Sequence, residues 1–132
     1  MVLDYERLPF ADQSIDVVVF DPPFQPQTVN GLIGEKFTKI NGGVSEVKSS
    51  VQKGCAEAWR VARLGIIVKV QDYIHDHKPV WMSLWVIETL GEPYDFVTLR
   101  AASKLQAPNW KRQLSVRRNH STFWVYRRKS LR

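Results

Sequence analysis

The tetrapeptide Asp21-Pro22-Pro23-Phe24 is the part of this sequence whose residue types are best suited to chemistry. It directly follows residues 17–20, a short run rich in β-branched side chains that predicts a buried strand. In open α/β sheets, ligands bind beyond the carboxyl ends of the strands, which is where this acid would lie. The two prolines fix φ and remove two donors, so they hold the backbone after the acid rigid. The alternative is a strand followed by a Pro-rich turn with no chemical role.

Residues 8–24 (LPFADQSIDVVVFDPPF) resemble the segment around the catalytic tetrapeptide of class I S-adenosylmethionine-dependent methyltransferases. The likeness is greatest to the amino-methyltransferases, which modify exocyclic nitrogens of nucleic-acid bases. It continues downstream: residues 59–61 close a helix, residues 65–72 look like the next strand of that fold, and residues 120–128 resemble its final strand. The resemblance covers nearly the whole chain, from about residue 3 to residue 129.

The resemblance implies a role for each residue of the tetrapeptide. Asp21 and the carbonyl of Pro22 would accept hydrogen bonds from the two hydrogens of an exocyclic amine, Pro23 would keep the turn rigid, and Phe24 would stack on a flipped or single-stranded base. Transfer would be a direct in-line displacement that depends on positioning and charge placement. An Asp in first place favours adenine or cytosine, because relatives acting on RNA guanine or protein glutamine often carry Asn there.

The cofactor implied is S-adenosylmethionine, but the sequence predicts an incomplete pocket for it. Family members carry a Gly-rich loop after their first strand, and here the twenty residues before Asp21 contain no glycine. Asp4 resembles an acid that contacts the cofactor adenine in many relatives; the alternative is an ordinary surface acid. We therefore predict an α/β chain equivalent to the C-terminal half of a Rossmann-like methyltransferase fold. Residues 1–132 would form one truncated domain.

Hydropathy and turn signals predict about four strands and two main helices. The strands are expected at residues 15–20, 66–71, 94–102 and 121–127, in a mostly parallel sheet with an antiparallel last strand. A first helix is expected to begin at Ser49, with Gln52 completing a capping box, and to stop at a left-handed Gly65. Its apolar face is expected to comprise Val47, Val51, Cys55, Ala58, Trp59 and Ala62.

A second helix is expected to be capped by Asp76, with Pro79 in its first turn and Gly91 at its end. Its buried side chains would be Val80, Trp81, Leu84, Trp85 and Ile87. The sequence His75-Asp76-His77 could suggest a metal site, but adjacent side chains point in divergent directions and no third spaced ligand is evident. We therefore expect a helix start there, and no metal.

Charge is divided sharply along the chain. Residues 1–95 hold nine Lys and Arg against thirteen Asp and Glu, a net of −4, whereas residues 96–132 hold ten Lys and Arg and no acid. A basic strand-loop-strand interleaved with aromatic and amide side chains suits phosphate contact and base stacking, and predicts nucleic-acid binding, with DNA favoured. The alternative is a solvated basic segment. The candidate contacts are Lys111, Arg112, Arg117, Arg118 and His120.

The remaining features concern compartment and assembly. The single cysteine excludes an internal disulfide and fits a reducing, cytoplasmic compartment, and no apolar stretch approaches the roughly 20 residues of a membrane span. Residues 17–20 read as a strand buried on both faces, yet the upstream strands that would cover it are missing. An open apolar edge invites pairing, so we expect a homodimer or a complementing subunit.

Three functions remain open at this point. The chain is a nucleic-acid amino-methyltransferase, a degenerate methyltransferase domain that binds nucleic acid without cofactor, or a structural subunit that pairs through its open sheet edge.

Overall fold

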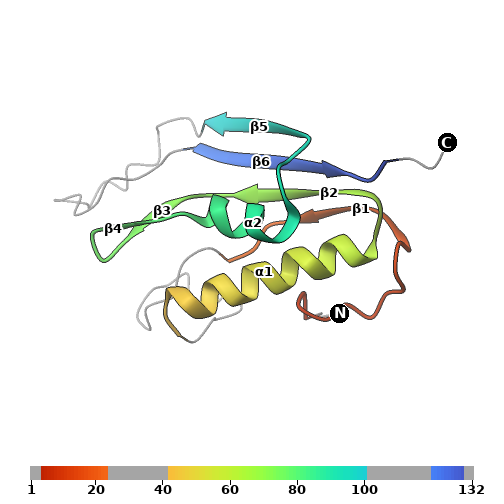
Figure 1. Ribbon diagram of the computed structural model, residues 1–132, viewed down its shortest axis with the longest axis horizontal. Helices are drawn as coiled ribbons and strands as arrows, with labels where there is room; N and C mark the ends of the chain where they lie inside the picture. The colour runs from red at the N-terminus through yellow and green to blue at the C-terminus, as the bar shows by residue number, and fades with distance from the viewer. Residues whose placement is uncertain (1–3, 24–41, 101–119, 130–132) are drawn as a thin grey trace, which may run out of the picture.

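The computed structural model of the chain describes residues 4–23, 42–100 and 120–129 (Figure 1). These residues form a four-stranded sheet, a small hairpin and two helices. In chain order the elements are β1 (Ile15–Phe20), α1 (Val44–Val61), β2 (Ala62–Val70), β3 (Tyr73–His75), β4 (Lys78–Val80), α2 (Met82–Leu90), β5 (Asp95–Arg100) and β6 (His120–Arg127). The mixed α/β class and the two helices agree with the sequence prediction.

The order of strands in the main sheet is β1-β2-β6-β5. The last strand, β6, enters between β2 and β5 and runs antiparallel to both, while β1 and β2 are parallel. Three strands therefore point the same way and the last one opposes them, as expected. However, only one of the three neighbouring pairs is parallel, so the expected mostly parallel pairing is wrong for these four strands. The cause is the insertion of β6 into the middle of this group.

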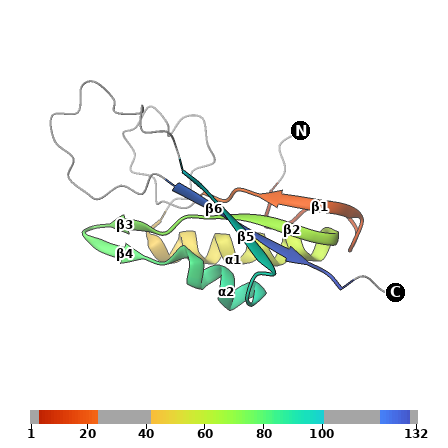
Figure 2. The ribbon, with the colours of Figure 1, turned by 90° about the horizontal axis from the view of Figure 1, so that it is seen from above.

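Both helices cover the same face of the sheet (Figure 2). Alternate residues of β2, namely Ile66, Val68 and Val70, turn toward them and are buried. The core also contains Val47, Val51, Cys55 and Ala58 from α1 and Met82, Trp85 and Val86 from α2. Four of the six residues expected on the apolar face of the first helix are thus confirmed; Trp59 is only partly buried, and Ala62 is buried but belongs to β2. Cys55 is a core side chain, and burial raises the pKa of its thiol to about 12.

The other face of the sheet is exposed in the described part of the chain. Val17 and Val19 on β1 are 48% and 66% exposed, and Val97 and Leu99 on β5 are 52% and 56% exposed. Residues 17–20 therefore alternate between the exposed face and the helix-covered face of the sheet, with Val18 packed against the core and Phe20 buried. The run has the composition of a strand buried on both faces, but one face and one edge are open among the described residues, as expected for a strand without its upstream neighbours.

Two expectations about α1 are corrected. The helix begins at Val44, five residues before Ser49, because the Glu46 carboxylate accepts a hydrogen bond from the N–H of the N-cap residue Gly43 at 2.8 Å, which is the one half of a capping box that a glycine allows. It ends at Val61, and Gly65 lies within β2. A Cβ atom at position 65 would lie 2.2 Å from the Tyr126 carbonyl oxygen, so the glycine allows close strand approach and does not terminate a helix.

The expected capping of the second helix by Asp76 is also wrong. Asp76 and His77 adopt positive φ values of 47° and 61° and form the turn between β3 and β4, a conformation that suits a two-residue hairpin loop. Helix α2 begins later, at Met82, and Gly91 follows its end as expected. The Asp72 carboxylate supports the helix start by accepting hydrogen bonds from the Ser83 N–H at 2.8 Å and hydroxyl at 3.0 Å.

Fewer side chains around α2 are buried than expected. Trp85 is buried, whereas Trp81, Leu84 and Ile87 are 45%, 52% and 37% exposed. The reason is that α2 has only nine residues and rests on α1 and β2 through one side. Strands β5 and β6 agree with the expected third and fourth strands to within two residues at each end. Neither helix in the described ranges is long and apolar enough to cross a membrane.

Candidate functional site

Asp21 is the first residue beyond β1, and its side chain is 60% exposed. Strand β1 is paired with β2 so that Phe20 lies opposite Val68, which places Asp21 beside Lys69 at the carboxyl end of both strands. Pro22 and Pro23 follow in an extended segment, with Pro22 buried. The acid therefore lies where the sequence prediction put it, at the end of a strand and open to solvent.

Lys69 holds the Asp21 carboxylate. Its Nζ lies 2.9 Å from Asp21 Oδ2, within the distance of a charge-assisted hydrogen bond. The Lys69 side chain is only 25% exposed, because it lies on the sheet surface between its neighbours. Sequence reasoning missed this residue: the signal was a single charge in the apolar strand 65–70, but the partner, 48 residues away, depends on strand register.

The same end of the sheet also carries two positions from the basic residues 96–132. Parallel β2 ends there, and antiparallel β6 begins there, since Val70 pairs with Thr122. The last pair between β5 and β6 joins Arg100 to His120, so the end of β5 and the start of β6 lie at the end of the sheet that carries Asp21 (Figure 1). His120, Asp72 and Ser83 line a small pocket there, together with Gln71, Thr122, Trp124 and Val70.

The residue before Asp21 is anchored by close packing. The Phe20 ring contacts Tyr5, with ring centroids 5.5 Å apart, and lies directly over Gly54 of α1. A Cβ atom at position 54 would lie 2.3 Å from the Phe20 ring, so only glycine admits the ring at this depth. The Tyr5 hydroxyl is hydrogen-bonded to Ser50, which also donates to Glu6. This packing fixes the end of β1 against the helix layer.

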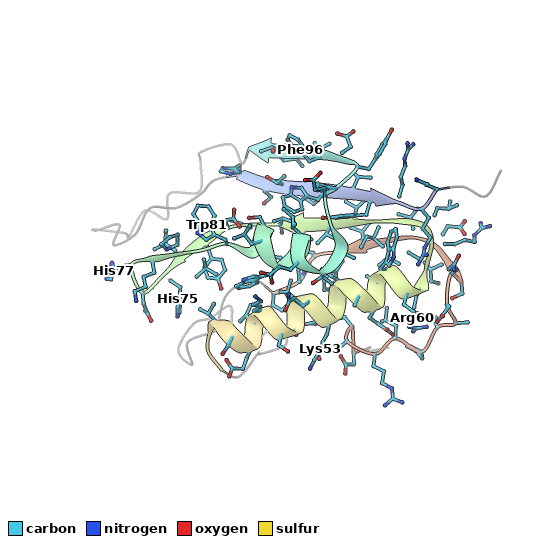
Figure 3. The ribbon with its side chains drawn as sticks, viewed as in Figure 1. Lys53, Arg60, His75, His77, Trp81 and Phe96 are labelled. Carbon is cyan, nitrogen blue, oxygen red and sulfur yellow. The ribbon has the colours of Figure 1, made fainter. Side chains whose placement is uncertain are left out.

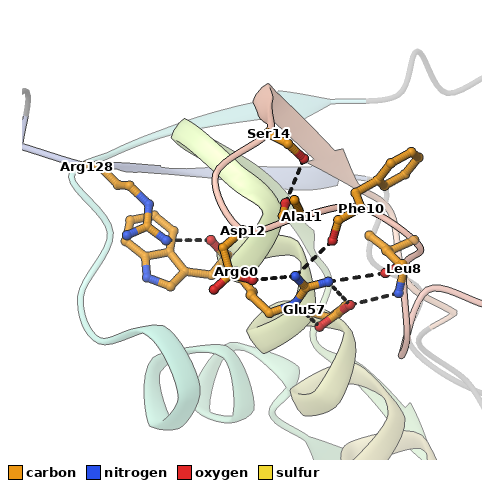
Figure 4. Close-up of polar contacts among 9 residues, drawn as sticks. Leu8, Phe10, Ala11, Asp12, Ser14, Glu57, Arg60 and Arg128 are labelled. Atoms are coloured by element: carbon orange, nitrogen blue, oxygen red, sulfur yellow. Dashed lines mark hydrogen bonds and ion pairs between the residues drawn. The ribbon is translucent and has the colours of Figure 1, made fainter.

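The segment that leads into β1 is fixed by Arg60 (Figure 4). Its guanidinium donates to the Leu8 and Phe10 carbonyls at 3.2 and 2.9 Å and pairs with Asp12 and Glu57 at 2.6 Å. Glu57 in turn accepts a hydrogen bond from the Leu8 N–H at 2.8 Å. Hydrogen bonds from Arg60 lower the pKa of Glu57 to about 2. This cluster is a structural clamp on the chain upstream of the tetrapeptide.

Asp4, the expected cofactor contact, lies in an exposed turn. Its Oδ1 accepts a hydrogen bond from the Glu6 N–H at 2.9 Å, and its carbonyl accepts one from the Arg7 N–H. The geometry describes a turn acid and leaves its expected cofactor role a prediction. His75 and His77 lie at the hairpin tip (Figure 3). In the described ranges, no three His, Cys, Asp or Glu side chains gather closely enough to hold a metal ion.

Several expected site residues lie outside the described residues. These are Phe24, Lys111, Arg112, Arg117 and Arg118. Of the nucleic-acid contacts expected from the sequence, His120 alone is described, and it is half-buried at the start of β6.

Comparison with known proteins finds likeness in structure alone: no protein-family model and no curated protein matches the sequence. The solved PvuII DNA methyltransferase, described as cytosine-N4-specific, superposes with a TM-score of 0.57 at 19% identity, over 89% of this chain and 43% of its own. A putative DNA modification methylase from Thermus thermophilus superposes with a TM-score of 0.51 at 14% identity, over 96% of this chain and 52% of its own.

The chain has the fold of a DNA methyltransferase. It spans about half the length of these structural neighbours. The Thermus thermophilus protein has also been solved in complex with S-adenosyl-L-methionine, and that complex matches this chain with a TM-score of 0.51 at 11% identity.

Beside Asp21 the face of β1 is apolar and exposed at Val17 and Val19, and its outer edge is unpaired among the described strands. The described residues next to the Asp21 carboxylate are therefore an open apolar strand face, and S-adenosylmethionine as the cofactor of this chain stays a prediction.

Proposed function

We propose that this chain is a nucleic-acid amino-methyltransferase that methylates an exocyclic base amine of DNA with S-adenosylmethionine. The observation that carries the proposal is the Asp21 carboxylate, exposed at the carboxyl end of β1 and followed by two prolines, within a DNA methyltransferase fold. The proposal assumes that the described strands and helices correspond to the C-terminal half of a Rossmann-like methyltransferase fold.

In this mechanism Asp21 and the Pro22 carbonyl accept hydrogen bonds from the two amine hydrogens. The lone pair of such an amine is delocalised into the base ring, and this pair of acceptors favours a tetrahedral nitrogen whose lone pair is available. S-adenosylmethionine, when bound, supplies a methyl group on a sulfonium. The amine nitrogen would take this methyl group as the thioether S-adenosylhomocysteine leaves, and it would lose a proton to water by way of Asp21. Phe24 stacks on the base, and Asp4 is the candidate contact for the cofactor adenine.

Methyl transfer to DNA tests the enzyme directly. The full chain is incubated with S-adenosylmethionine carrying a labelled methyl group and with duplex and single-stranded DNA, and the modified base is identified by mass spectrometry. We expect label on adenine N6 or cytosine N4, and its loss in Asp21→Ala with DNA affinity unchanged. Asp16→Ala, at the start of β1 and 64% exposed, is the matched control and should keep full activity. Equal activity in wild type and Asp21→Ala would refute the assignment.

Residues 96–132, the basic region, are proposed to bind the DNA backbone. Two of its positions, Arg100 and His120, are paired at the end of the sheet that carries Asp21, which supports phosphate contacts near the reacting base. We expect Arg117→Ala with Arg118→Ala to weaken binding to all sequences alike. The slope of log K against log salt should fall by about 0.9 for each phosphate that the variant no longer neutralises. Arg63→Ala, on the opposite end of the sheet and paired with Asp16, is the control. Salt-independent binding would contradict the proposal.

The chain is further proposed to work as a homodimer or with a complementing subunit. The exposed Val17 and Val19 on β1 and the unpaired outer edge of that strand, within the described sheet, support association. Light scattering at micromolar concentration should give a mass above 15.3 kDa for the chain alone if it self-associates. A monomeric mass would exclude the homodimer.

A degenerate methyltransferase-like subunit that binds nucleic acid or a partner without activity is the second candidate. Calorimetric titration with S-adenosylmethionine separates the two: saturable micromolar binding supports the enzyme, and no binding supports the inactive subunit.

A further inference from the structure

The role proposed for Asp21 requires its carboxylate to keep one orientation. The backbone after it is rigid because Pro22 and Pro23 fix φ, but its own side-chain torsions are not fixed by that rigidity. The carboxylate is 60% exposed, so packing does not hold it either. A carboxylate that must receive an amine in one orientation needs a further group to orient it.

Lys69 is placed to supply that orientation. In the part of the chain that the structure describes, its ammonium makes the one hydrogen bond to the Asp21 carboxylate, at 2.9 Å to Oδ2. The second oxygen, Oδ1, has no partner among the same residues. Lys69 also lies on a strand paired on both sides, β1 on one and β6 on the other, so its Cα is fixed by two ladders.

The partly buried position of the Lys69 ammonium is energetically unfavourable unless its charge is paired. It is the one charged residue of β2 beyond Arg63, and its side chain is three-quarters covered on a sheet face whose neighbouring positions include Ile67 and the facing Phe123. Covering a lysine in this way is unfavourable unless its charge is paired. The ion pair with Asp21 satisfies it, and Asp21, being exposed, gains a fixed direction at little desolvation cost.

We infer that Lys69 is a positioning residue, which holds Asp21 by Oδ2 so that Oδ1 faces the amine to be methylated. This inference rests on the proposed function. Lys69 does not touch the reacting atoms; it restricts the rotation of the carboxylate that does. Its loss should therefore lower the rate of transfer and leave the affinity for DNA and for S-adenosylmethionine unchanged.

The test uses three variants of the full chain. Lys69→Met keeps an unbranched side chain one atom shorter and removes the charge. Lys69→Arg keeps a donor that can reach the carboxylate, and Lys48→Met is the matched control. Lys48 makes an ion pair of similar length, 2.8 Å to Glu88, between α1 and α2 and away from Asp21. Because Asp21 is exposed, Lys69→Met leaves no buried unpaired charge there and is expected to fold.

Two measurements decide the matter. The first is independent of activity: three-bond couplings between the α and β protons of Asp21, measured by NMR, report its χ1 rotamer. We expect one rotamer in wild type, in Lys69→Arg and in Lys48→Met, and averaging among rotamers in Lys69→Met. The second is the single-turnover rate, which should fall about tenfold to a hundredfold in Lys69→Met, the scale of a misplacement near 1 Å, and recover in Lys69→Arg.

The outcomes separate the two proposals. Unaveraged couplings in Lys69→Met, or a wild-type rate in it, would overturn the role of Lys69 while leaving the methyltransferase proposal standing. A wild-type chain that transfers no methyl group yet shows the expected couplings would refute the proposed function instead, and the catalytic part of this inference with it.

Discussion

Replacing Gly65 by Ala should destabilise the sheet at the point where β2 and β6 approach most closely. The added methyl carbon would lie 2.2 Å from the Tyr126 carbonyl oxygen and 3.0 Å from the Arg127 Cα, both of them backbone atoms of β6. Side-chain rotation cannot relieve contacts with backbone, so the strands must separate by about an ångström. Overpacking of this kind costs roughly 1–3 kcal/mol, and rigid neighbours put this case near the upper end.

An opposing effect must be subtracted. Gly→Ala stabilises a protein by about 0.4–1 kcal/mol where the folded backbone tolerates it, because the unfolded chain loses freedom. The net expectation for Gly65→Ala is a loss of about 2 kcal/mol. At about 3–4 °C per kcal/mol for a domain of this size, the melting temperature should fall by about 7 °C.

Urea unfolding followed by circular dichroism measures this free energy, and amide chemical shifts of β2 and β6 show where the change lies. Gly43→Ala is the matched control. A methyl carbon there would lie 3.6 Å from Glu46 Oε2, an ordinary contact, and the loss of a favourable N-cap residue offsets the gain in the unfolded state. Its stability should stay within about 0.5 kcal/mol of wild type. A Gly65→Ala chain as stable as wild type, with unshifted β2 and β6 amides, would refute the close approach.

Two further predictions concern the polar contacts that fix the helices. Arg60 lowers the pKa of Glu57 to about 2 from an ordinary 4.5, so the stability this pair contributes is complete above pH 4.5 and is lost as pH falls toward 2. The urea midpoint of Glu57→Gln should thus lie below wild type at pH 7 and converge with it near pH 2; a constant gap would contradict this. Asp72→Ala removes the acceptor for the Ser83 N–H and should cost about 1 kcal/mol by thermal unfolding, against less than about 0.5 for exposed Asp95→Ala, and equal losses would contradict the capping role.

The sequence predicted the elements whose signals are local. Strand β1 could be recognised by its β-branched residues and by the prolines after Asp21, and the apolar face of α1 by its helical spacing. Gly65 and Asp76 were misassigned for a common reason: a glycine after a helix and an acid before an apolar run are ambiguous signals. Tertiary contacts decide between their meanings, since Gly65 is required by β6, and the true acceptor at the start of α2 is Asp72 on the far side of a hairpin.

In the candidate site, too, one residue has a local sequence signal and the other depends on tertiary structure. Asp21 could be predicted as a candidate from the residues next to it, whereas Lys69 is brought beside it by a register that pairs Phe20 with Val68. A shift of that register by one residue would turn Lys69 to the helix face and bury a charge in the core. The apolar alternation of β2 forbids that shift, since Ile66, Val68 and Val70 must face the helices. The burial pattern of one strand therefore excludes a one-residue shift and keeps Lys69 on the open face of the sheet, where the observed register brings it beside Asp21.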